Sequence, residues 1–235
     1  NAKEVLEQWA QHYPGVRIMS YFVTGGTGFI GQNLIELLLK RRGKIYVLVR
    51  KGSEEKLEKL KLRWGNKAAN RVVAVRGDLG KAYLGVSPAK RKELQGKVDH
   101  FFHLAAIYDL KADAEAQEIA NIKGTQNAVR LAETLKSKRF HHVSSIAAAG
   151  LYPGIFTEEM FDEAVGLDNA YFRTKHDSEG LVRKSCKIPW RIYRPGIVVG
   201  HSETGEIDKI DGPYYFFKLI QKMRRAMPAW MPAIG

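Results

Sequence analysis

Features that would point to particular protein classes are missing or scarce in this sequence. Cys186 is the single cysteine among 235 residues, which excludes an internal disulfide and fits a reducing compartment. No uncharged apolar run reaches the roughly 18 residues that a membrane-spanning helix needs. His103 has no second histidine, cysteine or carboxylate at the spacing of metal ligands, which argues against a metal site. We therefore expect a cytoplasmic protein without a bound metal, and we leave open a peripheral contact with a membrane surface.

Acidic residues are scarce relative to basic ones. The chain has 38 lysines and arginines against 25 aspartates and glutamates, a formal net charge of +13. A nucleic-acid partner is not indicated, because the basic residues are spread over many segments and do not alternate with stacking aromatics in one stripe. Small polyanions fit better, since nicotinamide cofactors and coenzyme A carry several phosphate charges. A basic surface that only contacts solvent remains the alternative.

Short apolar segments alternate with amphipathic ones along most of the chain, which is typical of a parallel, doubly wound α/β sheet. The expected strands cover residues 21–23, 44–50, 71–75, 98–104, 140–143 and 190–193. The expected helices cover residues 29–39, 53–64, 112–135 and 170–183, and a further helix starts at Ser87-Pro88. Six such strands predict a Rossmann-type fold with a ligand crevice at their carboxyl ends.

This alternation divides the chain into three parts. Residues 1–18 are expected to be a leader or appendage, and residues 19–200 the Rossmann domain that binds the dinucleotide. Residues 201–235 are expected to begin a C-terminal substrate-binding part that the chain does not complete. Within that part, residues 214–225 place apolar side chains on one helical face and basic ones on the other. This helix is expected either to pack on a core or to contact an acyl chain, coenzyme A phosphates or an anionic membrane.

A glycine-rich turn after the first expected strand is the strongest functional signal. Its spacing, Gly25-x-x-Gly28-x-x-Gly31 between a strand and a helix, is typical of a dinucleotide site rather than of a turn without a ligand. Gly25 lets the chain leave the strand sharply, Gly28 leaves room for a pyrophosphate, and Gly31 lets helix and strand pack closely. The helix N-terminus directs its N–H groups toward the phosphates. The expected cofactor-binding residues of this turn are Thr24, Gly25, Thr27, Gly28, Phe29, Ile30 and Gly31.

The ends of the next strands indicate which dinucleotide binds. Arg50 and Lys51 end the second strand with no acid before Glu54, which favours a 2′-phosphate and therefore NADP(H). A surface pair that only contacts solvent is the alternative. After the third strand, the Asp78 carboxylate and the Leu79 amide suit the adenine base. After the fourth strand, small residues allow close approach to the nicotinamide ribose, and the residues expected there are His103, Ala105 and Ala106.

Tyr171 and Lys175 stand four residues apart in an expected helix, so they share one helical face. A free phenol titrates near pH 10, too high for efficient proton exchange at neutral pH. A nearby ammonium stabilises the phenolate and lowers that pKa, so the phenol becomes a usable acid or base. Val143-Ser144-Ser145 at the end of the fifth strand adds hydroxyl groups. This combination predicts a catalytic site rather than an ordinary solvent-exposed helix face.

Taken together, these motifs resemble those of the extended short-chain dehydrogenase/reductases. The resemblance rests on the glycine turn, Asp78-Leu79, His103-x-Ala105-Ala106, Asn121, Ser145, Tyr171-x-x-x-Lys175 and Arg194-Pro195-Gly196. Within this family the chain is similar to the fatty acyl-CoA and thioester reductase branch, through residues 47–50, the helix at Lys56-Leu57, and residues 144–150 and 200–205. The resemblance covers about residues 19–235. Family members continue into a larger acyl-binding region, which puts the substrate pocket in doubt.

The resemblance implies a role for each matching residue. Tyr171 would be the proton donor, Lys175 its tuner and ribose anchor, and Ser145 the hydroxyl that orients the carbonyl. Asn121 would shape the helix behind the site. Pro195-Gly196 would lie against the nicotinamide.

The activity that the resemblance implies is NADPH-dependent reduction of fatty acyl thioesters such as acyl-CoA, or of long-chain fatty aldehydes, toward fatty alcohols. A sterol- or sugar-nucleotide-type dehydrogenase is the alternative on the same fold, because fold alone does not set the substrate. A binding module that senses NADP(H) is the non-enzyme alternative, and the intact serine, tyrosine and lysine argue against it. The sequence does not indicate an oligomeric state.

Overall fold

The computed structural model describes residues 18–107, 113–201 and 203–207, together with the single residues Tyr214, Phe216, Phe217, Ile220 and Lys222. The chain separates into two compact units, Asn1–Gly196 and Ile197–Gly235. The expected leader lies outside the described residues except for Ile18, and the expected domain boundary at residue 200 stays a prediction. In the expected helix over residues 214–225, the five described residues are helical.

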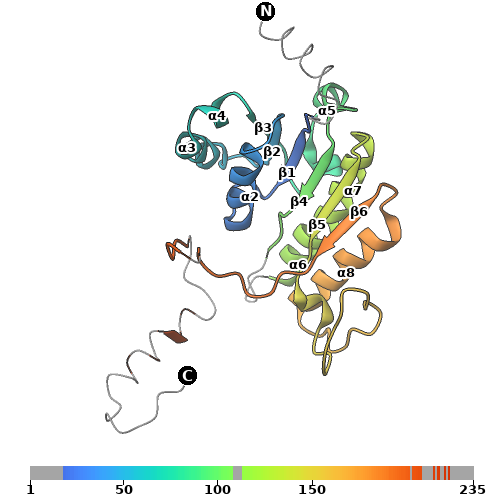
Figure 1. Ribbon diagram of the computed structural model, residues 1–235. Coiled ribbons are helices and arrows are strands. Elements are labelled where there is room, and N and C mark those ends of the chain that lie inside the picture. The colour runs from blue at the N-terminus through green and yellow to red at the C-terminus, as the bar shows by residue number, and fades with distance from the viewer. Residues whose placement is uncertain are drawn as a thin grey trace, which may run out of the picture. The chain divides into compact units, whose positions relative to one another are not determined.

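Six parallel strands form one sheet in the first unit, in the order β3-β2-β1-β4-β5-β6. The strands are β1 (Tyr21–Thr24), β2 (Ile45–Val49), β3 (Val72–Arg76), β4 (His100–His103), β5 (Arg139–Val143) and β6 (Trp190–Tyr193). The chain winds outward from β1 to β3, crosses to β4 beside β1, and then winds the other way (Figure 1). This reversal between β1 and β4 is where doubly wound sheets bind ligands. The predicted fold is therefore confirmed.

Helices connect the strands. They are α2 (Phe29–Leu39), α3 (Glu54–Trp64), α4 (Asn66–Ala69), η1 (Ala82–Gly85), α5 (Pro88–Leu94), α6 (Ala114–Gln117), η2 (Glu118–Lys123), α7 (Gly124–Thr134), η3 (Ile146–Ala149) and α8 (Ala170–Ser185). The start predicted at Ser87-Pro88 is confirmed, because the Ser87 hydroxyl accepts the Lys90 N–H and caps α5. Among the described residues, no helix has both the length and the apolar character needed to cross a membrane.

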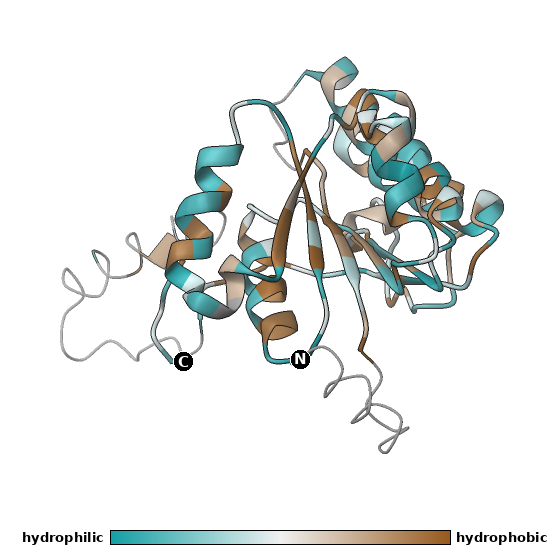
Figure 2. Cartoon of the chain, turned by 90° about the horizontal axis from the view of Figure 1, so that it is seen from above, coloured by the Kyte–Doolittle hydropathy of each residue, from teal (hydrophilic) through white to brown (hydrophobic). Residues whose placement is uncertain are grey.

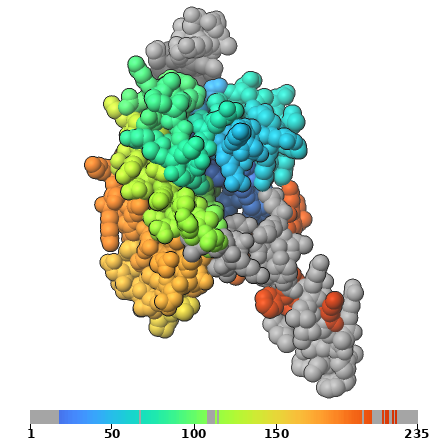
Figure 3. All heavy atoms as spheres, turned by 180° about the vertical axis from the view of Figure 1, so that it is seen from behind, coloured from blue at the N-terminus to red at the C-terminus, as the bar shows by residue number. Residues whose placement is uncertain are grey.

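Two apolar cores lie on opposite faces of the sheet, because successive strand residues point to opposite sides. On one face, Phe22, Phe101 and Phe140 pack with residues of α7 and with Val182 of α8. On the other face, β1 and β2 contribute Tyr21, Val23, Ile45 and Val47, which pack with residues of α2 and α3. Figure 2 shows the hydrophobic strands between helices whose hydrophilic residues face outward. Figure 3 shows, from behind, the surface of the β1–β3 half in cyan adjoining that of the β4–β6 half in yellow-green to orange.

The long helix expected over residues 112–135 is not uniform. Residues 111 and 112 lie outside the described residues, and the rest divides into α6, the π-helical segment η2 and α7. Asn121 lies in η2, and its side chain bonds both backbone groups of Ile107 and the hydroxyl of Thr174. A widened π-helical turn is a common feature of functional sites. The prediction of a helix is correct, and the prediction of a regular one is wrong.

Three histidines are buried in β4 and β5 and are neutral at neutral pH. Burial and the nearby Lys175 charge lower the pKa of His103 to about 3. Burial, followed by the charges of His100, Arg191 and Arg139, lowers the pKa of His141 to about 4. Burial also holds the pKa of His142 well below its ordinary value, with His103 and Lys175 adding to the effect. Protonating any of them would place a charge in the core.

We expect the free energy of unfolding to fall as the pH decreases from about 6.5 toward 4. In this window the unfolded histidines bind protons and the folded ones do not, so each lowers stability by about 1.4 kcal/mol per pH unit. Urea unfolding at several pH values measures the slope. The double variant His103→Gln/His142→Gln should have a shallower slope than the parent, and equal slopes would contradict this explanation.

Candidate active site

The glycine turn between β1 and α2 is closed by its own backbone and by the segment after β4. Gly25 has a φ of +69°, and a Cβ there would lie 2.7 Å from the backbone nitrogen of Ala105. A Cβ on Gly31 would lie 2.2 Å from the Gly25 carbonyl oxygen. Gly28 precedes the first residue of α2, whose first N–H groups have no helical partner by geometry. The turn therefore fits a dinucleotide: it leaves space for a pyrophosphate and presents N–H donors at a helix N-terminus.

Gly31 allows α2 to pack closely against the turn that leaves β1, as predicted, and a second glycine allows a further close approach. Gly31 packs on Gly25 and Gly26 of the turn itself. A Cβ on Gly26 would lie 2.7 Å from the Val47 side chain of β2 and 2.9 Å from Ile35 of α2. Gly26, which the sequence pattern did not single out, therefore also allows helix and strand to approach.

Gly31→Ala and Gly28→Ala are expected to separate folding from cofactor binding. Alanine at position 31 forces the turn open, which should destabilise the protein by about 1–3 kcal/mol and abolish dinucleotide binding. Alanine at position 28 would lie 3.3 Å from the Gly25 carbonyl, so folding should survive while binding fails. Urea unfolding and NADPH fluorescence titration measure the two effects.

Gly96→Ala is the control, because Gly96 has a positive φ and open space around it, and it precedes β4, away from the carboxyl ends of the strands. It should carry only a backbone strain cost and retain binding. Normal NADPH affinity in a folded Gly28→Ala protein would show that no pyrophosphate approaches this turn.

Thr24 and His103 join the ends of β1 and β4. The Thr24 hydroxyl accepts the N–H groups of Leu104 and Ala105, each at 3.2 Å, and lies 2.8 Å from Nδ1 of His103. The other ring nitrogen of His103 lies 3.1 Å from the Thr125 hydroxyl. Both predicted cofactor-binding side chains are thus buried and bonded to protein. Because the His103 ring is bonded to protein on both sides, the part of this segment that can contact a cofactor is the backbone of Ala105-Ala106.

Asp78 and Leu79 shape the exit of β3. The Asp78 carboxylate accepts the Gly80 N–H at 2.9 Å, and its backbone N–H donates to Leu84 at 2.7 Å. The Leu79 carbonyl accepts the side-chain amide of Asn127 at 2.9 Å. These bonds fix the segment that is predicted to receive the adenine.

Arg50 and Lys51 are exposed just beyond β2, and their contact with a phosphate stays a prediction. The sheet register adds Arg76, because it pairs with Val49 at the end of β3. Glu54, the nearest acid, accepts the Gly52 N–H at 2.7 Å and pairs with Arg76 at 3.4 Å. Sequence reasoning did not consider Arg76, since only the pairing of β2 with β3 brings it beside Val49 and the residues that follow it.

Helix α8 carries Tyr171 and Lys175 to the end of β5. Asn169 caps this helix by accepting the backbone N–H groups of Tyr171 and Phe172. Lys175 is buried, and its ammonium donates to the Val143 carbonyl at 3.3 Å. Tyr171 is half-buried one helical turn earlier.

Ser145 caps the N-terminus of η3, two residues beyond Val143. Its hydroxyl accepts the Ala147 N–H at 3.1 Å, and its side chain is almost buried. The following N–H, of Ile146, donates to the Pro195 carbonyl at 3.2 Å, which joins η3 to the segment after β6. The predicted Pro195-Gly196 pair therefore lies beside the predicted catalytic serine. The structure thus joins Lys175, Ser145 and Pro195 through the ends of β5 and β6.

Burial controls the charge of Lys175. It lowers the pKa of the ammonium to about 8, although the carboxylate of Glu179 opposes the shift. Glu179 lies on α8, is fully buried, and bonds Arg183 and Arg194. Sequence reasoning did not consider Glu179. Its position four residues after Lys175 could have indicated that the two side chains share one face of α8.

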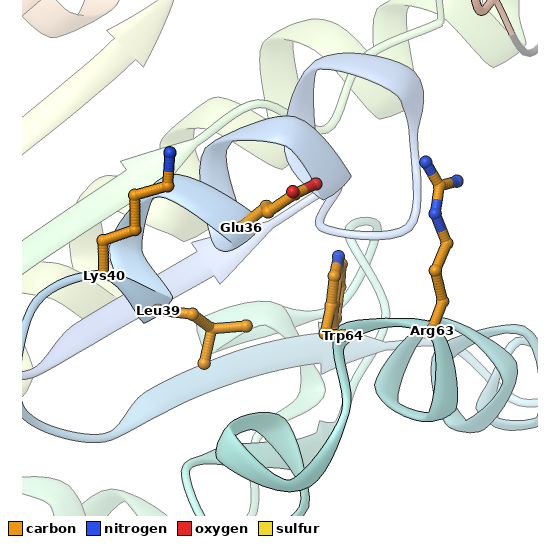
Figure 4. Close-up of a pocket in the computed structure, with 5 residues that line it drawn as sticks. All are labelled: Glu36, Leu39, Lys40, Arg63 and Trp64. Carbon is orange, nitrogen blue, oxygen red and sulfur yellow. The ribbon is translucent and has the colours of Figure 1, made fainter.

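A hollow of about 260 Å³ lies elsewhere, between the C-terminal ends of α2 and α3. Glu36, Leu39, Lys40, Arg63 and Trp64 line it, and Figure 4 shows their side chains around it. It lies at the opposite end of α2 from the glycine turn, so it is not part of the site described above. Among the described residues, no group of histidine, cysteine and carboxylate side chains is suited to hold a metal.

Comparison with known proteins identifies the family. Residues 23–234 match the model of an NAD-binding family described as male sterility protein. The chain is 32% identical over 221 residues to the non-canonical nonribosomal peptide synthetase hkm10 of Aspergillus hancockii, covering 85% of this chain and 21% of that protein. It is 33% identical over 204 residues to aldehyde reductase lnbA of Aspergillus flavus, covering 78% of this chain and 20% of that protein.

A solved structure agrees with these relatives. The terminal R domain of the myxalamid PKS-NRPS pathway matches with a TM-score of 0.74 and 31% identity, over 88% of this chain and 56% of that chain. The chain thus spans about a fifth of the two curated relatives and about half of the solved domain. The match to an NAD-binding family and the close packing of the glycine turn both indicate a nicotinamide dinucleotide as the cofactor. The chain belongs to the NAD-binding male sterility protein family, and its fold is that of an extended short-chain dehydrogenase/reductase.

Proposed function

We propose that the chain is the cofactor-binding and catalytic part of an NADPH-dependent reductase of acyl thioesters or aldehydes. The observation that carries this proposal is the hydrogen bond from the Lys175 ammonium to the Val143 carbonyl. Val143 stands two residues before Ser145, and Lys175 follows Tyr171 by one turn of α8. The glycine turn lies at the same edge of the parallel sheet, because all six strands end there. A relative that is an aldehyde reductase, and a solved neighbour from a PKS-NRPS pathway, support this class of reaction.

In this reaction the side chains of the site act on a carbonyl oxygen. The hydroxyls of Ser145 and Tyr171 donate hydrogen bonds to the oxygen as negative charge develops on it. Tyr171 then gives its proton, and the Lys175 ammonium favours the phenolate that remains. Lys175 would also hold the ribose hydroxyls of the cofactor. When bound, the nicotinamide supplies a hydride to the carbonyl carbon.

A thioester and an aldehyde give different products in the first reduction. A reduced thioester is a hemithioacetal, which releases a thiol and leaves an aldehyde. A second reduction of that aldehyde gives an alcohol through the same donors. The second step needs a second NADPH in place of the oxidised cofactor but no additional side chain, so both reductions are compatible with one set of side chains.

The proposed substrate is a fatty acyl thioester such as acyl-CoA, or a long-chain fatty aldehyde. The net charge of +13 suits the phosphates of coenzyme A. In the second unit, Phe216, Phe217 and Ile220 are helical and expose 65%, 49% and 56% of their surface, which suits an alkyl chain. Leu219 and Met223, which belong to the same predicted face, lie outside the described residues. Peripheral contact with a membrane surface belongs to the same proposal.

Tyr171→Phe tests the reaction. The variant keeps the ring and loses one oxygen, so folding and NADPH binding should persist while turnover drops at least about 10²-fold. NADPH oxidation is followed with palmitoyl-CoA, a long-chain aldehyde and a sugar nucleotide. Phe172→Tyr, a neighbouring aromatic change, is the control and should retain turnover. Wild-type activity on the sugar nucleotide alone would replace the proposed substrate, and an active Tyr171→Phe would remove Tyr171 from the mechanism.

The choice of NADPH over NADH is proposed from the charges at the ends of β2 and β3. Arg50 and Arg76 supply two guanidinium groups there, and a guanidinium matches a phosphate bidentately. Glu54 would repel a 2′-phosphate, because hydrogen bonds from its own backbone N–H and from Gly52, together with the Arg76 charge, lower the pKa of its carboxyl and keep it charged. Its ion pair with Arg76 at 3.4 Å offsets part of that charge.

Arg50→Ala should weaken NADPH binding by about 1.5–3 kcal/mol and leave NADH binding nearly unchanged. The reason is that only NADPH carries the phosphate that this guanidinium would contact. Fluorescence titration with both cofactors measures the difference. Arg63→Ala, at the other end of α3, is the matched control. A similar loss for both cofactors would place Arg50 away from the 2′-phosphate.

A further inference from the structure

A buried ion cluster lies one helical turn below Lys175. The Glu179 carboxylate has no exposed surface and accepts from Arg183 at 2.9 Å and from two nitrogens of Arg194 at 3.1 and 2.6 Å. Arg183 extends from the next turn of α8, whereas Arg194 follows β6. Removing one partner from such a cluster leaves an uncompensated buried charge, so the three groups are held together strongly.

Arg194 also organises the loop between η3 and α8. Its guanidinium donates to the carbonyls of Thr157 and Met160 at 2.9 and 2.7 Å. Phe161, the residue after Met160, stacks on His176 of α8 with ring centroids 4.2 Å apart. Glu179 therefore connects the helix of the proposed catalytic residues to the loop and to the segment that carries Pro195.

The charged surroundings of Lys175 come from several elements. On α8 itself, Glu179 lies one turn after it and Tyr171 one turn before. His103 of β4 and His142 of β5 interact with its charge from the sheet, and both are neutral at neutral pH. Arg194 and Arg183 add positive charge on the far side of Glu179. Glu179 is thus the one carboxylate among these groups.

We propose that Glu179 is a positioning residue whose buried carboxylate, held by Arg194 and Arg183, keeps Lys175 protonated for cofactor binding and proton transfer. Burial works against the ammonium, and a fixed negative charge one helical turn away works for it. The role of Glu179 therefore depends on its charge and not only on its shape. This inference rests on the proposed function, because it acts through Lys175 as ribose anchor and partner of Tyr171.

Burial alone would raise the pKa of Glu179, but Arg194, with smaller contributions from Ser144 and Arg183, holds it below its ordinary value. The carboxylate is therefore charged throughout the neutral range. The opposing effects of burial and Glu179 leave Lys175 with a pKa of about 8. A change at Glu179 should therefore move a titration that is measurable near neutral pH.

Two variants of Glu179 separate charge from shape. Glu179→Gln keeps the shape and removes the charge, whereas Glu179→Asp keeps the charge and shortens the side chain. The titration midpoint of Lys175 is measured from its side-chain NMR signal in the cofactor-free protein, and NADPH affinity is measured against pH. Glu179→Gln should lower both midpoints by about one pH unit or more, and Glu179→Asp should stay closer to wild type.

Glu133→Gln is the matched control. Glu133, at the end of α7, accepts the Lys187 N–H and is not bonded to the cluster. It should leave the midpoint of Lys175 unchanged. A merely structural role for Glu179 predicts the opposite order, with the isosteric glutamine near wild type and aspartate impaired, and that order would overturn the proposal.

A second change keeps the test decisive if Glu179→Gln does not fold. Glu179→Leu/Arg194→Met replaces the buried pair by apolar side chains, a change that buried ion pairs often tolerate. It should also lower the midpoint of Lys175, and an unchanged midpoint would overturn the proposal. A shift in the midpoint without NADPH binding by wild type would sustain this inference and reject the proposed function. NADPH binding by wild type, with no change in the Lys175 midpoint in the Glu179 variants, would reject this inference and leave the proposed function standing.

Discussion

The close approach of the glycine turn to the backbone after β4 is the constraint on which the site depends. Gly25 leaves no room for a side chain beside Ala105, and the Thr24 hydroxyl bonds the same backbone from β1. His103 completes the junction by joining Thr24 to Thr125 of α7. Because β2 pairs in parallel with β1 and β5 in parallel with β4, their carboxyl ends lie at the same edge of the sheet as this junction. The helix N-terminus, Arg50 and Val143 are then presented at one edge of the sheet.

Buried polar groups around this junction explain why it holds one geometry. His103 is neutral at neutral pH, so it accepts and donates hydrogen bonds without bringing a charge into the core. Asn121 in turn bonds the backbone of Ile107 and the hydroxyl of Thr174, which ties the π-helical segment to both the residues after β4 and α8. Each of these polar side chains has its partner, and fully satisfied buried networks of this kind restrict the core to one arrangement.

The charges of the site are divided between its surface and its interior. The basic groups after β2 and β3 are exposed, where a phosphate can reach them without a large desolvation cost. Lys175 and Glu179 are buried, where each affects the ionisation of its neighbours strongly. An exposed cation suits recognition of an anionic ligand, whereas a buried cation suits the tuning of a phenol. The roles proposed for these cations therefore differ with their depth.

The sequence by itself determined the sheet class, the glycine turn, the pair Tyr171 and Lys175, and the family resemblance, because these depend on local spacing and periodicity. The expected helix over residues 112–135 lacked its π-helical segment, since the contact of Asn121 with Ile107 is not local. Tertiary structure alone decided that Gly26 approaches β2, that Arg76 stands beside Arg50, and that Arg194 reaches Glu179. These contacts depend on strand order and helix docking, which bring together residues that are far apart in the chain.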